Sequence, residues 1–208
     1  GQFYGYEYAG VENGDMMIYT DEGEKVPVSK ADVKYKRHIG NGTPTSYLSW
    51  SNTLRYKNFD LTVDLQFVLG VDVYQQFLHS TEDRFGIANA LSSVLSEGWT
   101  PANTNTMIPA LYSQNSQPDS HWVANGSYLR ANLIQLGYTF EPSVLKALHL
   151  GSLRAYFSVN NAFCITSKDF KGYDPEGTSQ GTDQWGQNIM FFQYPKPRTY
   201  TLGVNVSF

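Results

Sequence analysis

The clearest feature of the sequence is a stretch in which every second residue is apolar. From Phe59 to Val73 all odd-numbered positions are apolar, whereas the positions between them are mostly polar and include Asp60 and Asp64. A period of two is typical of a β-strand with one apolar face and one polar face. The predicted strand, residues 59–74, is longer than most strands of globular proteins. It is long enough to cross a bilayer, which takes about 9–11 residues of a tilted strand.

Five further stretches predict strands of the same kind: residues 2–10, 47–57, 127–141 and 152–163, and the end of the chain from Arg198. The last stretch keeps its alternation to Phe208, although chain ends usually fray and carry polar residues. We therefore predict about six antiparallel strands in an all-β fold. We also expect Tyr200 and Phe208 to form a C-terminal signal for barrel assembly.

The connections between the predicted strands alternate between short and long. Residues 57–58 and 142–151 are short connections, whereas residues 11–46, 75–126 and 164–197 are long ones. Short periplasmic turns and long extracellular loops are typical of outer-membrane barrels. The sequence therefore predicts part of a transmembrane antiparallel β-barrel with long extracellular loops. In the second loop, the acidic residues after Ser80 and the helical spacing of apolar residues predict a short helix that ends near Gly98.

Six strands are too few for a closed barrel. Bacterial barrels have at least about eight strands, and amphipathic strands with open edges would aggregate. We therefore expect the missing strands to lie upstream, in a larger barrel.

The alternation also assigns side chains to two environments. The residues predicted to face lipid are Leu61, Leu65, Phe67, Phe157, Leu202 and Val204. The residues predicted to face the barrel lumen are Arg55, Asp60, Asp64 and Arg154. These four side chains either have a role in the barrel interior or form ordinary ion pairs in its wall. Trp50 is expected in the aromatic belt of the membrane interface.

Composition narrows the choice of function. Aromatic residues make up 15% of the chain, and Tyr and Trp favour sites that are apolar at one end and wet at the other. The mean hydropathy of −0.39 fits a barrel wall, whose strands alternate. The sequence has no run of 18 apolar residues, so it predicts no transmembrane helix. The net charge of −4 and the absence of a basic patch argue against nucleic acid as a partner. The chain begins without Met or a signal peptide, so we expect a mature form or a fragment.

Catalytic and metal-binding patterns are weak. The four histidines are scattered, no catalytic motif occurs, and we expect surface or loop histidines in a non-enzyme without cofactors. The acidic residues of the third loop suggest a calcium site as one hypothesis: Asp169, Asp174, Glu176 and Asp183. Their spacing matches no EF-hand loop, so we favour solvated acids and predict no metal.

Three tryptophans fall in the predicted extracellular loops: Trp99, Trp122 and Trp185. Their rings could contact a substrate or a partner protein, because amphipathic aromatic rings make good contact surfaces. The alternative is that they pack the long loops into a compact cap.

Several segments together resemble one known family. They are residues 56–61 (YKNFDL), 99–105 (WTPANTN) with Pro109, 126–130 (GSYLR) with 136–138 (LGY), 160–163 (NNAF), 172–176 (GYDPE), and 194–195 (YP) through 198–208. In this order they resemble the C-terminal barrel region of the SusC/RagA family of TonB-linked outer-membrane transporters, over nearly the whole chain. One departure is the turn at residues 14–23, which lacks the family's Asp/Asn-Gly-rich pattern, so any role of that turn is in doubt here.

The resemblance implies a barrel of about 22 strands with an N-terminal plug. It implies that residues 1–208 are the C-terminal part of the barrel, and that the plug and the TonB-contacting region lie outside this chain. It further implies the outer membrane of a Gram-negative bacterium, energy through TonB, a SusD-like surface lipoprotein as a lid, and an oligosaccharide or peptide as cargo. The loop tryptophans would then contact the lid or the cargo, and the lumen-facing charges could pair with the plug.

Two other functions remain open from the residues alone. A soluble all-β carbohydrate-binding module would also alternate apolar and polar residues. A non-transporting barrel anchor would share the membrane strands but lack an upstream plug.

Overall fold

The computed structural model describes residues 1–82, 89–113, 117–176 and 188–208. The chain divides into two compact units. The first, here called the loop unit, comprises Gly1–Thr43, Val71–Gly126 and Lys168–Gln193. The second, here called the sheet unit, comprises Pro44–Gly70, Ser127–Ser167 and Tyr194–Phe208. None of the helices in the described residues is long and apolar enough to span a membrane.

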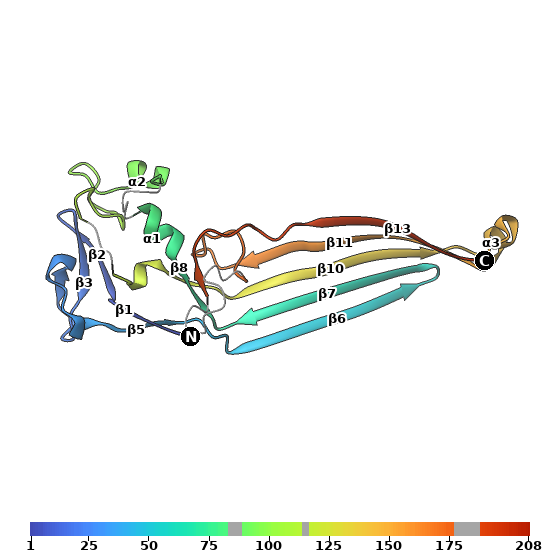
Figure 1. Cartoon of the computed structure of the whole chain (residues 1–208), viewed down its shortest axis with the longest axis horizontal. Coiled ribbons are helices and arrows are strands. Elements are labelled where there is room, and N and C mark those ends of the chain that lie inside the picture. The colour runs from blue at the N-terminus through green and yellow to red at the C-terminus, as the bar shows by residue number, and fades with distance from the viewer. Residues whose placement is uncertain (83–88, 114–116, 177–187) are drawn as a thin grey trace. The chain divides into compact units, whose positions relative to one another are not determined.

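The sheet unit is built on one five-stranded antiparallel sheet (Figure 1). Its strands are β6 (Ser46–Tyr56), β7 (Phe59–Leu69), β10 (Tyr128–Thr139), β11 (Ser152–Thr166) and β13 (Thr199–Ser207). They pair in the order β13-β11-β10-β7-β6. Four strands have 11 to 15 residues, which confirms the prediction of long antiparallel strands.

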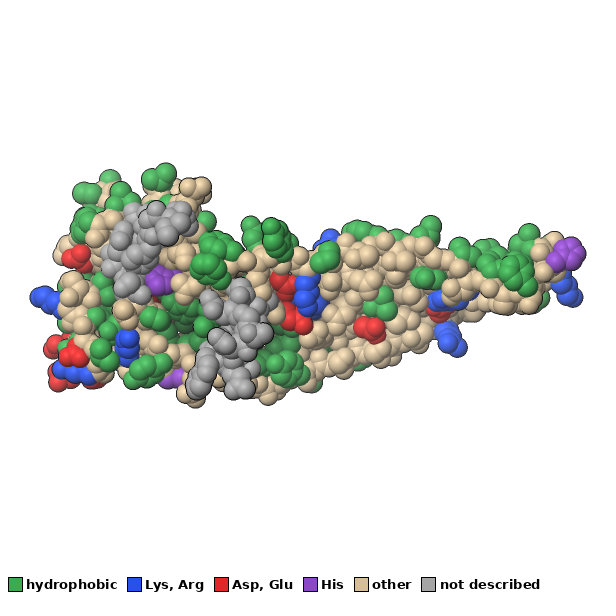
Figure 2. Space-filling view, in the orientation of Figure 1, with side chains coloured by type: hydrophobic (Ala, Val, Ile, Leu, Met, Phe, Trp, Pro, Cys, Tyr) green, Lys and Arg blue, Asp and Glu red, His purple; other side chains and the backbone are tan. Residues whose placement is uncertain are grey.

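The strand register places apolar and polar residues in separate rows. One row crosses all five strands with apolar side chains only: Leu54, Leu61, Leu136, Phe157 and Leu202. The adjacent row lies on the opposite face and consists of Arg55, Asp60, Gly137, Tyr156 and Gly203. Side chains alternate along the strands on both sides of a register shift between Ala131 and Leu133 of β10, so the sheet has one mainly apolar face and one mainly polar face. Figure 2 shows a face of this sheet on which backbone and uncharged polar groups surround a few charged side chains.

Two short connections join strands at one end of the sheet. Lys57 adopts a φ of 54° in the tight turn between β6 and β7. The connection between β10 and β11 contains a helix, α3 (Pro142–Leu148), which the sequence pattern did not predict. It ends at His149 in the left-handed conformation, where the Leu150 N–H donates to the carbonyl of Leu145 over 3.0 Å. This pattern is a common helix C-cap.

At the other end of the sheet, a hydrogen bond joins the residue after β7 to the residue before β10. The Gly70 N–H donates to Ser127 Oγ over 3.0 Å, although the two residues are 57 positions apart. Gly70 has a φ of +65°, and a Cβ at this position would lie 2.1 Å from Thr45 Oγ1. The predicted strand 59–74 therefore ends at Leu69, because this glycine turns the chain out of the sheet.

The described residues of the loop unit form three small sheets. The first pairs β1 (Gln2–Gly5) with β5 (Arg37–Asn41), and the second comprises β2 (Tyr8–Glu12), β3 (Asp15–Tyr19) and β4 (Lys25–Pro27). In the third, β8 (Asp72–Gln75) lies between β9 (Val123–Asn125) and β12 (Ile189–Met190). The helices are α1 (Gln76–Glu82), α2 (Ser92–Ser96) and the 3₁₀ turns η1 (Val28–Lys30), η2 (Val33–Tyr35) and η3 (Ser120–Trp122).

Two predictions for this part of the chain were wrong. The first predicted strand, residues 2–10, is split into β1 and β2, and both belong to the loop unit rather than to the five-stranded sheet. The predicted helix from Ser80 to Gly98 is also wrong, because residues 89–91 are not helical and α2 begins at Ser92. The hydroxyls of Ser80 and Thr81 donate to carbonyls one turn earlier, so these residues lie within α1 instead of capping its start.

Candidate functional site

The polar face of the sheet carries an ion pair that spans three strands. Arg154 on β11 reaches across β10 to Asp60 on β7, with its Nε 3.1 Å from Oδ1 and its Nη2 2.5 Å from Oδ2. Two parallel N–H···O bonds of this kind fix the orientation of both groups. The Arg154 guanidinium also lies over the Tyr156 ring, 5.5 Å from its centroid.

Gly137 on β10 leaves the space that this ion pair occupies. A Cβ at Gly137 would lie 2.3 Å from Arg154 Nη2 and 2.6 Å from both carboxylate oxygens of Asp60. Gly203 has the same relation to Tyr156, whose ring would be 2.3 Å from an added Cβ. The sequence alone does not indicate these two glycines, because their role depends on strand register, which a single sequence does not reveal.

A hollow of about 800 Å³ opens over this end of the polar face. Its lining includes Arg55, Asp60 and Arg154, together with hydroxyl and amide groups of Thr53, Thr62 and Gln135. Arg55 is exposed and directly opposite Asp60 in the register. Further along the same face, Ser51 Oγ donates to Asp64 over 2.5 Å. All four residues predicted to face the lumen therefore lie on one face, and two of them pair directly.

The opposite face is apolar and open. The six residues predicted to face lipid all lie on it. Leu61 pairs with Leu136, which pairs with Phe157, and the register places the other predicted residues on the same face. Leu202 is 80% exposed, Val204 59% and Phe157 45%. Trp50, expected in the aromatic belt, lies on this face and is 47% exposed. Within the described residues, nothing covers these exposed side chains.

The end of the chain continues this face. Tyr200 lies beside Phe157 with their rings stacked at 6.3 Å between centroids, and it is 63% exposed. Phe208 is 99% exposed. Nothing in the structure tests their predicted role as an assembly signal, which stays a prediction.

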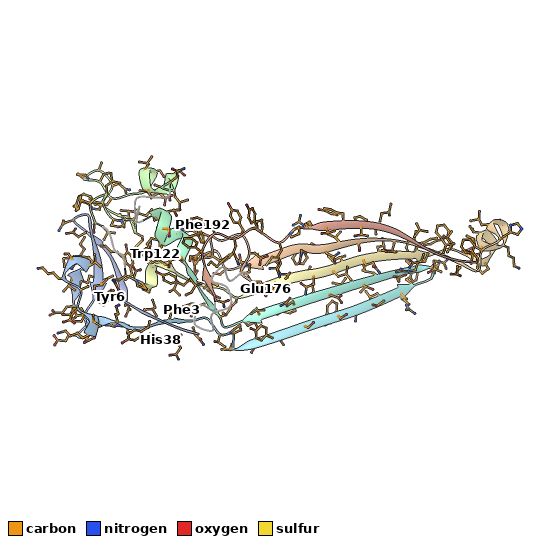
Figure 3. All side chains as sticks on the ribbon, viewed as in Figure 1. Phe3, Tyr6, His38, Trp122, Glu176 and Phe192 are labelled. Carbon is orange, nitrogen blue, oxygen red and sulfur yellow. The ribbon has the colours of Figure 1, made fainter. Side chains whose placement is uncertain are left out.

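The tryptophans of the predicted loops have different surroundings. Trp122 is 2% exposed and packs with Phe3, Tyr74 and Leu78 in a core cluster of the loop unit (Figure 3). The prediction that it contacts a substrate or partner is therefore wrong, and the alternative of loop packing holds for it. Trp99 is half-buried and remains a candidate. Trp185 lies outside the described residues.

Histidines surround Trp122, which the sequence did not indicate. The His79 ring stacks on the Trp122 ring at 5.4 Å, and the His121 ring meets it edge-on at 4.4 Å. His79 is buried, which contradicts the expectation of surface or loop histidines. His121 Nε2 lies 3.4 Å from the buried carboxylate of Glu82. The cluster holds α1 against η3, and we assign it a packing role.

Of the acidic residues of the third loop, Asp169, Asp174 and Glu176 lie in the described part of the chain. Asp174 accepts a hydrogen bond from the Glu176 N–H over 3.0 Å, which forms a local turn. Within the described residues, no group of three or more acidic, histidine or cysteine side chains could hold a metal ion. Asp183 lies outside the described residues.

Comparison with known proteins agrees with this geometry. No protein-family model matches the chain. The TonB-dependent receptor P3 of Formosa agariphila is 31% identical over all of this chain, which spans 22% of that receptor. The TonB-dependent receptor SusC of Bacteroides thetaiotaomicron is 29% identical over 99% of this chain and 19% of its own length.

Solved structures give the same result. The structure of the RagAB peptide transporter matches all of this chain with a TM-score of 0.83 and 28% identity, over 23% of the matched chain. The closed-closed state of the RagAB peptide importer matches 99% of it with a TM-score of 0.82. The five-stranded sheet therefore corresponds to part of the barrel of TonB-dependent receptors. The chain is a relative of the TonB-dependent receptors of the SusC/RagA type, and it spans about a fifth of the length of the curated relatives that it matches.

Proposed function

We propose that this chain forms part of the wall and the outer loops of a TonB-dependent nutrient importer in the outer membrane of a Gram-negative bacterium. The observation that carries the proposal is the division of the five-stranded sheet into one exposed apolar face and one polar face. A soluble protein would have to cover such an apolar face, whereas a membrane barrel turns it toward lipid. The relatives named above support the same assignment.

The polar face would line the interior of the barrel. It carries the Arg154–Asp60 ion pair and hydroxyl groups such as those of Thr53 and Thr62, which lie 3.1 Å apart. Water or protein in the interior can satisfy such groups, whereas the hydrocarbon layer cannot. The exposed Arg55 is suited to pair with a carboxylate of a plug inside the barrel.

The importer would work with partners that act outside this chain. Energy would come through TonB, which would contact an N-terminal region of the whole receptor. A SusD-like surface lipoprotein would cover the loop side. The cargo would be an oligosaccharide or a peptide, and the similarity to a peptide transporter makes peptides the first substrates to test.

The decisive experiment is to identify the native polypeptide that carries these strands. An antibody against the last residues would probe detergent-extracted membranes of the source organism. Because the chain of 23.4 kDa spans 22% of a relative, we expect a band of about 100 kDa in the outer-membrane fraction. Co-purification of a surface lipoprotein would support the SusD-like partner. A soluble band of the chain's own mass would overturn the proposal and leave a free-standing carbohydrate-binding module as the better explanation.

A further inference from the structure

An aromatic row marks the end of the sheet at which the short connections lie. The register aligns Tyr56, Phe59 and Tyr138 on the apolar face of three adjacent strands. The Phe59 and Tyr138 rings are 4.8 Å apart, and Phe140 meets Tyr138 edge-on at 5.1 Å. Tyrosine at the limit of an apolar band is typical of the interface between hydrocarbon and headgroups.

The length of the strands places this row at the membrane boundary. Leu48 and Tyr56 begin and end the apolar positions of β6, with Leu48 opposite Phe67 and Tyr56 opposite Phe59. At roughly 3.4 Å per residue they are about 27 Å apart along the strand. A tilt of about 40° reduces this to about 21 Å along the membrane normal, close to the height of about 25 Å of the apolar band of outer-membrane barrels. Residues just beyond the aromatic row therefore lie at headgroup level.

Helix α3 begins directly beyond this row, and it carries apolar groups that its own unit does not cover. Leu145 is half-buried and lines the hollow over the polar face. Val144 and Leu148, in contrast, are 39% and 54% exposed. They are four positions apart, so they lie on the same side of the helix. Lys146 is exposed and does not line the hollow.

We propose that α3 is an interfacial helix that binds the phospholipid headgroups of the leaflet at the short-turn end. Val144 and Leu148 reach the boundary with the acyl chains, and the Lys146 ammonium meets the headgroup phosphate. Lys57, whose Nζ lies 5.5 Å from the centre of the Tyr56 ring, lines the hollow over the polar face, so we assign no headgroup contact to it. Glu141 lines the hollow over the polar face, so its charge does not oppose the phosphates from the lipid side. Figure 2 shows hydrophobic, basic and histidine side chains together at this end. The inference rests on the proposed function, because it requires the apolar face to lie in lipid.

The first test measures contact between α3 and lipid in the whole receptor. Leu148→Trp would be reconstituted in phosphatidylcholine vesicles whose acyl chains are brominated near the carbonyl end, because bromine quenches tryptophan fluorescence on contact. We expect the added fluorescence, relative to the parent protein, to be quenched. Leu202→Trp on the sheet is the control for membrane insertion, and Leu95→Trp in α2, at a site that is 84% exposed, is the control for a loop in water.

The outcomes separate the two proposals. Quenching of Leu202→Trp without quenching of Leu148→Trp would overturn the interfacial helix and leave the importer intact. Absence of quenching in both would overturn the proposed function itself. Quenching of both but not of Leu95→Trp supports both proposals.

The second test measures the preference for anionic headgroups at the same site. Brominated phosphatidylglycerol would compete with brominated phosphatidylcholine in the Leu148→Trp protein. We expect Lys146→Gln to lower the relative binding constant for phosphatidylglycerol about five-fold, the effect of one basic residue at an anionic surface. Lys30→Gln, a change of an exposed lysine in the loop unit, should leave the constant unchanged. An unchanged constant in Lys146→Gln would overturn the role of its ammonium.

Discussion

The assignment of the two faces predicts a depth profile for a buried charge along β7. Five of its apolar positions lie opposite the span from Leu48 to Tyr56 of β6: Phe67, Leu65, Val63, Leu61 and Phe59, so Val63 is the central one of these five. Successive positions on one face are about 6.8 Å apart along the strand, which corresponds to about 5 Å of depth at a tilt of about 40°. Arginine facing lipid costs about 2–4 kcal/mol at the midplane and about 0–1 kcal/mol near the interface.

We therefore expect Val63→Arg to destabilise the receptor by about 2–4 kcal/mol, and Phe59→Arg and Phe67→Arg by much less through their charge. Changes on the polar face should have little effect on membrane insertion, so Asp64→Asn should assemble normally, whereas Leu65→Arg should not. The measurement is the free energy of folding from urea into phospholipid vesicles, with the fraction of heat-modifiable band as an independent check. A flat profile along β7, or an equal loss in Thr62→Arg and Val63→Arg, would refute the assignment of the faces.

Three further predictions concern other parts of the chain. Gly137→Ala should separate Arg154 from Asp60 and lower the free energy of unfolding by about 1–2 kcal/mol. This loss should not add to that of Asp60→Asn, because both changes break the same ion pair. Urea unfolding of the single and double variants measures both effects. Trp122→Ala should destabilise the loop unit by about 3–5 kcal/mol, seen as faster cleavage of that unit in limited proteolysis while the heat-modifiable band of the barrel persists. Burial, together with the nearby Asp32 carboxylate, raises the pKa of Tyr6, so the phenol loses its proton at a lower pH in the unfolded state than in the folded state. The stability of the loop unit should therefore fall as pH rises past 10.0. Limited proteolysis at increasing pH measures this fall, and Tyr6→Phe should make it smaller.

The sheet could be predicted from the sequence because its environment leaves a simple pattern. A sheet with one apolar face and one polar face requires alternation, and Leu61, Leu65 and Leu202 all lie at the apolar positions of their strands. A one-residue shift in register would move each of these side chains to the wrong face. The faces were therefore readable from the sequence before any pairing was known.

The loop unit could not be predicted in this way. Its strands have two to five residues, and some of them pair across long separations, as Gln2 does with Asn41, so no period develops. The alternating tyrosines of residues 4–8 have the sequence pattern of a membrane strand. In the structure Tyr4 is 64% exposed and Tyr6 is 3% exposed, so they do not share one environment. The burial of Trp122 depends on α1 and η3 meeting around it, which composition alone cannot indicate.

The site on the polar face was half predicted. Alternation identified Asp60 and Arg154 as lying on one face, but their pairing across β10 depends on Gly137 standing between them in the register. Such a glycine has no local signal in the sequence, because the alternation of residues 134–140 continues through it.

The hydrogen bond between Gly70 and Ser127 has a consequence for how such receptors diversify. It brings together two chain positions that are 57 residues apart, so the inserted segment begins and ends at nearly the same point. The entropic cost of closing a flexible loop grows only with the logarithm of its length, about 0.6 kcal/mol for each doubling. Insertions and deletions between these two positions should therefore leave the register of β7 and β10 unchanged. In the proposed importer, ligand preference could then evolve by exchanging one segment of the gene, while β7 and β10 stay the same.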